Sequence, residues 1–117
     1  ASLARQYATY SRNHGGNALY RIAAGADGSD LHWTETLMRS FDDLAADPGE
    51  PARPFQAVSL HYYTMSGSWS DKGDATGFST DEWYTTMARA RRIEELLTRH
   101  STAMDRYDPP RKVGLVV

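Results

Sequence analysis

Residues 57–64, AVSLHYYT, decide the fold, because apolar and polar residues alternate along them as in a β-strand. Successive side chains of a strand point to opposite faces of its sheet. The alternation puts Val58, Leu60 and Tyr62 on a face that suits packing under a helix, and Ser59, His61 and Tyr63 on a hydrogen-bonding face. A Gly- and Ser-rich stretch, MSGSWSDKGDATG (65–77), follows directly. Because α/β folds commonly build sites where a buried strand delivers polar groups into a loop, this strand end is the first candidate site. The alternative is a half-exposed strand whose polar side chains only form hydrogen bonds within the fold and have no functional role.

Composition excludes several classes of function. The chain has 117 residues, enough for one domain or part of a larger one. Its 13 basic and 15 acidic residues give a net charge of −2, which offers no electrostatic case for binding nucleic acid or an anionic membrane. The absence of cysteine excludes disulfides, thiolate catalysis and Cys-based metal sites. No apolar run approaches the ~20 residues that a membrane span needs, and no secretory signal pattern is present.

Helical and strand patterns alternate along the chain. Helices are predicted at about 2–13, at 31–45 and from Ser79 to the Asp108-Pro109-Pro110 stop, and strands at 18–24, 57–64 and 112–117. Residues 47–54, DPGEPARP, form a loop because proline forbids regular structure there. Strands that alternate with helices favour parallel pairing, so we expect an α/β fold of three parallel βα units. An eight-unit barrel takes ~250 residues, so the chain has the size of a barrel segment.

The predicted helices each have an apolar face. The expected buried positions are Leu3, Tyr7 and Tyr10 in the first helix, Trp33, Leu37, Phe41 and Leu44 in the second, and Trp83, Met87, Ala90, Ile93, Leu97 and Met104 in the third. Ser79 and Glu82 have the spacing of a capping box at the start of the third helix.

The ionisable residues predict no metal site and no cofactor. None of the four histidines lies four residues from another, and no HExxH motif occurs. We expect His100 to be a surface residue of the third helix. The arginines of MARARRIEELLTRH (87–100) are expected to form a solvated face with ion pairs to Glu94 and Glu95.

The carboxylates do not supply a hydrolytic pair. Hydrolysis of a glycosidic bond normally needs two carboxyl groups set against each other. The glutamates fall in predicted helices, except for Glu50 in the Pro-rich loop, and none ends a strand. Asp71 and Asp74 lie in the loop after the central strand, and Asp27 in the turn after the first strand.

Several separated motifs resemble one family. The α-L-arabinofuranosidases of glycoside hydrolase family 51 are the family that these motifs resemble: SLHYYT, GSW, KGDATGF, the helix from DEWY to RHSTAMDRYDP, and RKVGLVV. One βα unit earlier, the segment YATYSRNHGGNALYRIAAGADGSDLHWTETLM resembles the same family. The resemblance covers essentially the whole chain, in order. It implies that residues 1–117 are strands five to seven, with their helices, of a catalytic (β/α)8 TIM barrel, with no second domain in this stretch.

The resemblance also implies a reaction. The parent protein would be a retaining glycosidase that hydrolyses terminal arabinofuranosyl residues from arabinose-containing oligosaccharides. Both catalytic glutamates would lie outside this chain, so the 117 residues alone would be inactive. His61 and Tyr63 match the family's active-site His and Tyr at the end of strand six. Tyr63 would hydrogen-bond the nucleophile, His61 would tune the polar network, and Trp69 would border the sugar pocket. The family implies a cytoplasmic, homo-oligomeric parent.

Two other classes of function stay open on the sequence. One is a non-catalytic carbohydrate-binding module that uses the surface around Tyr63 and Trp69. The other is a structural βα module with no ligand.

Overall fold

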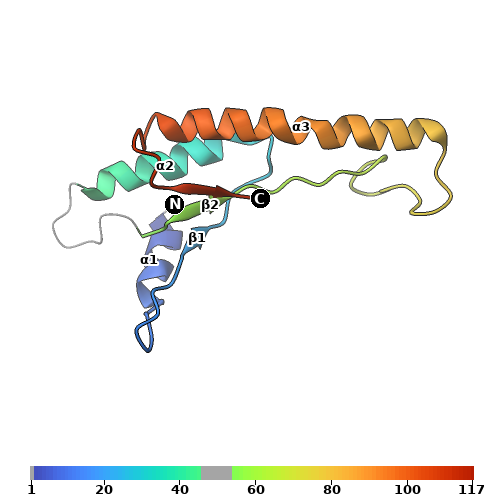
Figure 1. The fold of residues 1–117 in the computed structure, drawn as a ribbon. Helices are drawn as coiled ribbons and strands as arrows, with labels where there is room; N and C mark the ends of the chain where they lie inside the picture. Colours follow the sequence, from blue (N-terminus) through green and yellow to red (C-terminus); the bar gives the residue numbers. More distant parts are fainter. Residues whose placement is uncertain (1, 46–53) are drawn as a thin grey trace.

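The computed structural model describes residues 2–45 and 54–117, over which helices and strands alternate (Figure 1). The elements are α1 (Ser2–Tyr10), β1 (Ile22–Ala23), α2 (Leu31–Ala45), β2 (Ala57–Ser59), α3 (Thr80–Asp105) and β3 (Gly114–Val116). The strands form one parallel sheet in the order β1-β2-β3. The predicted α/β arrangement of three parallel strands and three helices is therefore confirmed.

The paired strands are shorter than the sequence pattern predicts. Ala57 lies opposite Ile22 on one side and Gly114 on the other, and the ladder between β2 and β3 ends where the Leu60 amide donates to the Val116 carbonyl. Residues 61–64, predicted as strand, continue beyond the sheet as a loop. The predicted apolar face is confirmed, because Val58 and Leu60 are buried and Tyr62 is half-buried.

The core lies between the sheet and the pair α2 and α3. Thr34, Leu37, Met38 and Phe41 are buried, which is the i, i+3, i+4, i+7 stripe of an amphipathic helix. The prediction of Trp33 as a buried position is wrong, because its side chain is 39% exposed and its indole N–H donates to the Ala24 carbonyl at 3.3 Å. The Leu44 side chain and residues 46–53, with Glu50 and most of the Pro-rich loop, lie outside the described residues.

Helix α3 begins with the predicted capping box. The Glu82 amide donates to Ser79 Oγ at 3.2 Å, and the Ser79 amide donates to the Glu82 carboxylate at 2.7 Å. The prediction of Trp83 and Met87 in the buried face is wrong, because α3 extends past α2 and the sheet at that end (Figure 1) and both side chains are exposed.

The prediction of a surface His100 is also wrong. His100 is 2% exposed and shares the buried face of α3 with Leu96, Ala103 and Met104. Its ring is satisfied by partners from α2 and from the turn after β1. Burial is possible because both ring nitrogens find partners inside the fold.

Helix α1 ends at Tyr10, three residues before the predicted end. Gly15 and Gly16 adopt positive φ angles in a separate turn, which is bridged between His14 and Asn17. Leu3, Tyr7 and Tyr10, predicted to be a packed face, are exposed because no described element covers them.

No helix in the described ranges is both long and apolar enough to cross a bilayer.

Candidate functional site

The three predicted site residues line one open pocket at the end of β2. His61, Tyr63 and Trp69 enclose about 480 Å³ together with Gly25, Ala26, Asp27, Tyr62 and Met65. The pocket lies at the carboxyl ends of β1 and β2, because these parallel strands point the same way. This end of a parallel sheet is where α/β folds place their sites.

Ser59 ties the ends of β1 and β2 together beneath His61. Its hydroxyl lies 3.0 Å from His61 Nε2, accepts the Gly25 amide at 3.0 Å and lies 3.3 Å from the Ala23 carbonyl. The backbones approach so closely that a Cβ at Gly25 would overlap the Ser59 carbonyl oxygen, so only glycine fits there. The His61 ring is therefore held by a strand residue on its own face, as the alternation predicts.

Asp27 is a pocket residue that the sequence reasoning left out of the site. Its Oδ1 accepts the Ser29 hydroxyl at 2.6 Å and the Ser29 amide at 2.9 Å, and its backbone forms a parallel bridge with His61. The Ser29 hydroxyl, followed by the Ser29 amide, lowers the pKa of the Asp27 carboxyl below its ordinary value. Asp27 thus accepts two hydrogen bonds from Ser29, and these bonds favour the ionised form of its carboxyl group. Its position in the turn after the first predicted strand was the feature of the sequence that could have indicated a pocket residue.

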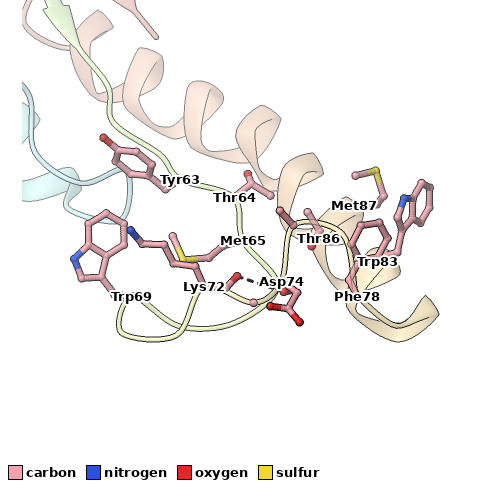
Figure 2. Close-up of a pocket in the computed structure, with 13 residues that line it drawn as sticks. Tyr63, Thr64, Met65, Trp69, Lys72, Asp74, Phe78, Trp83, Thr86 and Met87 are labelled. Carbon is pink, nitrogen blue, oxygen red and sulfur yellow. Dashed lines mark hydrogen bonds between the residues drawn. The ribbon is translucent and has the colours of Figure 1, made fainter.

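Tyr63 and Trp69 form an exposed aromatic pair. They are 64% and 67% exposed, and their ring centroids lie 5.2 Å apart in an edge-to-face arrangement. Lys72 Nζ lies 5.1 Å from the centroid of the Trp69 ring. Figure 2 shows this pair at one end of a longer groove, with Phe78, Trp83 and Met87 at the other.

Arg89 of α3 holds the loop that carries Trp69. Its Nη1 donates to the carbonyls of Met65 at 2.7 Å, Ser66 at 3.0 Å and Gly67 at 2.7 Å. The Tyr62 hydroxyl donates to the Arg89 carbonyl at 2.8 Å. The prediction of a solvated arginine face is therefore wrong for Arg89, whose guanidinium binds backbone, although Arg99 and Glu95 do form a helical ion pair at 3.6 Å.

The described residues contain no group of three His, Asp or Glu side chains that could hold a metal ion.

Two of the known proteins that match this chain are named as arabinofuranosidases. Over all 117 residues it is 39% identical to a Bacteroides ovatus protein named intracellular exo-alpha-L-arabinofuranosidase. The structure of this chain is also similar to the crystal structure of the GH51 arabinofuranosidase from Xanthomonas axonopodis pv. citri. The match covers 97% of this chain, with a TM-score of 0.81 and 36% sequence identity. The chain is homologous to a segment of family 51 arabinofuranosidases. The chain spans 21% of the length of each of these two proteins. No protein-family model matches the sequence.

Proposed function

We propose that this chain is part of the catalytic (β/α)8 barrel of a longer retaining α-L-arabinofuranosidase, and that it supplies strands five to seven with their helices. The observation that carries the proposal is the convergence of His61, Tyr63 and Trp69 on one pocket at the carboxyl ends of the strands. Active sites of (β/α)8 enzymes lie at that end of the barrel. The homology over the whole chain supports the same reading.

The proposed mechanism is double displacement by two glutamates that lie outside the 117 residues. A retaining pair stands ~5–5.5 Å apart, with one carboxyl as acid and base and the other as nucleophile. Asp27, the carboxylate in the pocket, does not fit the acid role because its hydrogen bonds to Ser29 favour the ionised form. The segment alone is therefore inactive, and its contribution is to position and bind.

Each pocket residue has a proposed role. The Tyr63 hydroxyl donates to the nucleophilic carboxylate and orients it. His61, fixed by Ser59, tunes the polar network beside the catalytic pair. The Trp69 ring borders the sugar and packs against it. Stacking on an aromatic ring suits a furanose face, because C–H groups contact the π surface.

The substrate is an arabinose-containing oligosaccharide from which a terminal arabinofuranosyl group is removed, in keeping with the exo activity in the name of the Bacteroides ovatus relative. The same name describes an intracellular protein, which supports a cytoplasmic location for the parent. We further propose that the parent is a homo-oligomer.

The test is a tyrosine-to-phenylalanine substitution in the full-length protein. Tyr63→Phe removes a hydrogen bond to a charged group, about 1.5–3 kcal/mol, and should lower kcat for arabino-oligosaccharide hydrolysis roughly 10- to 100-fold. Tyr84→Phe is the matched control, because Tyr84 is also 64% exposed but lies on α3. Equal kcat for the two variants would remove Tyr63 from the site.

The exposed Tyr63 and Trp69 pair also suits a carbohydrate-binding module without catalysis. Binding of arabino-oligosaccharide by the full-length protein without release of arabinose would favour that function.

A further inference from the structure

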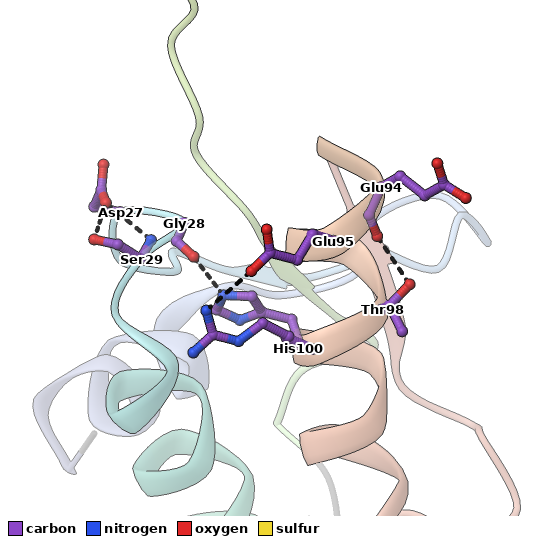
Figure 3. A network of polar contacts seen from close by, with 8 residues as sticks. Asp27, Gly28, Ser29, Glu94, Glu95, Thr98 and His100 are labelled. Atoms are coloured by element: carbon purple, nitrogen blue, oxygen red, sulfur yellow. Dashed lines mark hydrogen bonds and ion pairs between the residues drawn. The ribbon is translucent and has the colours of Figure 1, made fainter. Parts of the chain in front are cut away.

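A buried histidine connects helix α3 to the turn after β1. His100 Nε2 lies 2.9 Å from the Gly28 carbonyl (Figure 3). On the other side of the ring, His100 Nδ1 lies 2.9 Å from Thr34 Oγ1. A carbonyl only accepts hydrogen bonds, so Nε2 carries a proton. In the neutral ring Nδ1 then accepts from the Thr34 hydroxyl, and both nitrogens are satisfied. These two bonds fix the orientation of the ring.

The residue that His100 holds is itself bonded to His61. The Gly28 amide donates to the His61 carbonyl at 2.7 Å, and the adjacent Asp27 forms the parallel bridge with His61. A single residue, Gly28, thus accepts from the buried ring and donates to the backbone of the pocket histidine. The connection runs from α3 to the pocket in two hydrogen bonds.

Close packing makes the connection stiff. A Cβ at Gly28 would lie 3.1 Å from Leu96 Cδ1 and 3.3 Å from the His61 carbonyl oxygen, so the turn sits tightly between α3 and the strand end. Leu96 is buried one helical turn before His100. On its other side, His61 is held through its ring by Ser59. The backbone and the ring of His61 are therefore fixed by separate elements.

We propose that His100 is a positioning residue, which sets the place of His61 in the pocket through Gly28. The proposal rests on the proposed function in one respect, namely that His61 faces the substrate. The bond to Gly28 couples the buried ring to the turn, and the Gly28 amide is in turn bonded to the His61 carbonyl.

The test compares three variants of the full-length protein. His100→Leu removes the donor to Gly28, and His100→Gln restores an N–H donor on a side chain of similar reach. Leu37→Ala is the stability control, because it removes buried volume from α2 and Leu37 takes no part in the hydrogen bonds of the His100 ring or in that of the Gly28 amide. We expect His100→Leu to lower kcat roughly 10-fold with little change in KM, as for loss of an interaction that matters in the transition state. His100→Gln should recover most of the lost kcat, and Leu37→Ala should keep the wild-type kcat.

A second measurement does not depend on activity. Hydrogen exchange of the Gly28 amide reports its bond to His61, and should accelerate roughly 10-fold in His100→Leu and stay unchanged in Leu37→Ala when both are measured below their unfolding transitions. If the wild-type protein hydrolyses no arabinoside, the proposed function fails, and the exchange result still decides the connection. Unchanged Gly28 exchange in His100→Leu would overturn the inference, as would equal kcat losses in His100→Leu and Leu37→Ala.

Gly28→Ala keeps the test decisive if His100→Leu does not fold. The added methyl group pushes the turn away from Leu96 and the His61 carbonyl while His100 stays intact. We expect a several-fold lower kcat and faster exchange at residue 28. A wild-type kcat in this variant would contradict the proposal.

Discussion

Replacing Arg89 with methionine should release the loop that carries Trp69 while α3 stays folded. Methionine keeps an unbranched stem and a good helix propensity, but it has no guanidinium. Arg89 Nη1 has two hydrogens and three carbonyl acceptors within 3.0 Å, so two bonds form well at any moment. The acceptors are partly exposed, so water replaces the donor and each bond contributes about 1 kcal/mol. The loop should lose about 2 kcal/mol, which is roughly 30-fold in its opening equilibrium.

Hydrogen exchange within the loop measures this loss directly. The Ser68 amide donates to the Asp71 carbonyl at 2.7 Å, and the Asp71 amide donates to Ser68 Oγ at 3.2 Å. Both amides should exchange roughly 30-fold faster in Arg89→Met than in the wild-type protein, because each opening of the loop breaks these bonds. The control is Arg91→Met, which removes an equal charge from an exposed position of the same helix. If the two variants exchanged alike in this loop, the reasoning from the three carbonyl bonds would be refuted.

Three further predictions concern the framework of the site in the full-length protein. Leu96→Ala should destabilise it by about 2–5 kcal/mol, because the side chain is 2% exposed, and denaturant unfolding should detect the loss. The Ser79 amide and then its hydroxyl lower the pKa of Glu82, so its stabilisation is complete above the ordinary pKa of glutamate and is lost as pH falls through the lowered value. The difference in Tm between wild type and Glu82→Gln should therefore vanish in acid, and a constant difference would argue against the box. Asp108→Ala should cost about 1–3 kcal/mol in the same unfolding measurement, because the Val113 amide, now bonded to the buried carboxylate at 2.6 Å, loses its acceptor.

The sequence predicts the order of the elements because local chemistry decides it. Ser79 and Glu82, three residues apart, each accept a hydrogen bond from the other's backbone amide. The start of α3 can therefore be predicted from the local sequence alone. The alternation in residues 57–64 likewise puts Ser59 and His61 on one face, and the structure joins them by a contact of 3.0 Å. The convergence of His61 and Tyr63 with Trp69 follows from a strand end and the loop after it.

The features that the sequence did not predict depend on partners far away in the chain. His100 is bonded to Thr34 and Gly28, which are 66 and 72 residues distant, and no helical period encodes such a pairing. Arg89 finds its acceptors in backbone carbonyls, which every residue has and no pattern singles out. Trp83 is exposed because α3 is longer than α2. The spacing of apolar residues along α3 does not predict how far a neighbouring helix extends.

The way Arg89 binds its loop leaves the loop open to change. The guanidinium recognises the main chain of residues 65–67, and the side chains of Met65 and Ser66 take no part in these bonds. Substitutions there can alter the lining of the groove while the path of the backbone persists. A designer who wished to reshape the groove could vary these two positions and keep Arg89 unchanged.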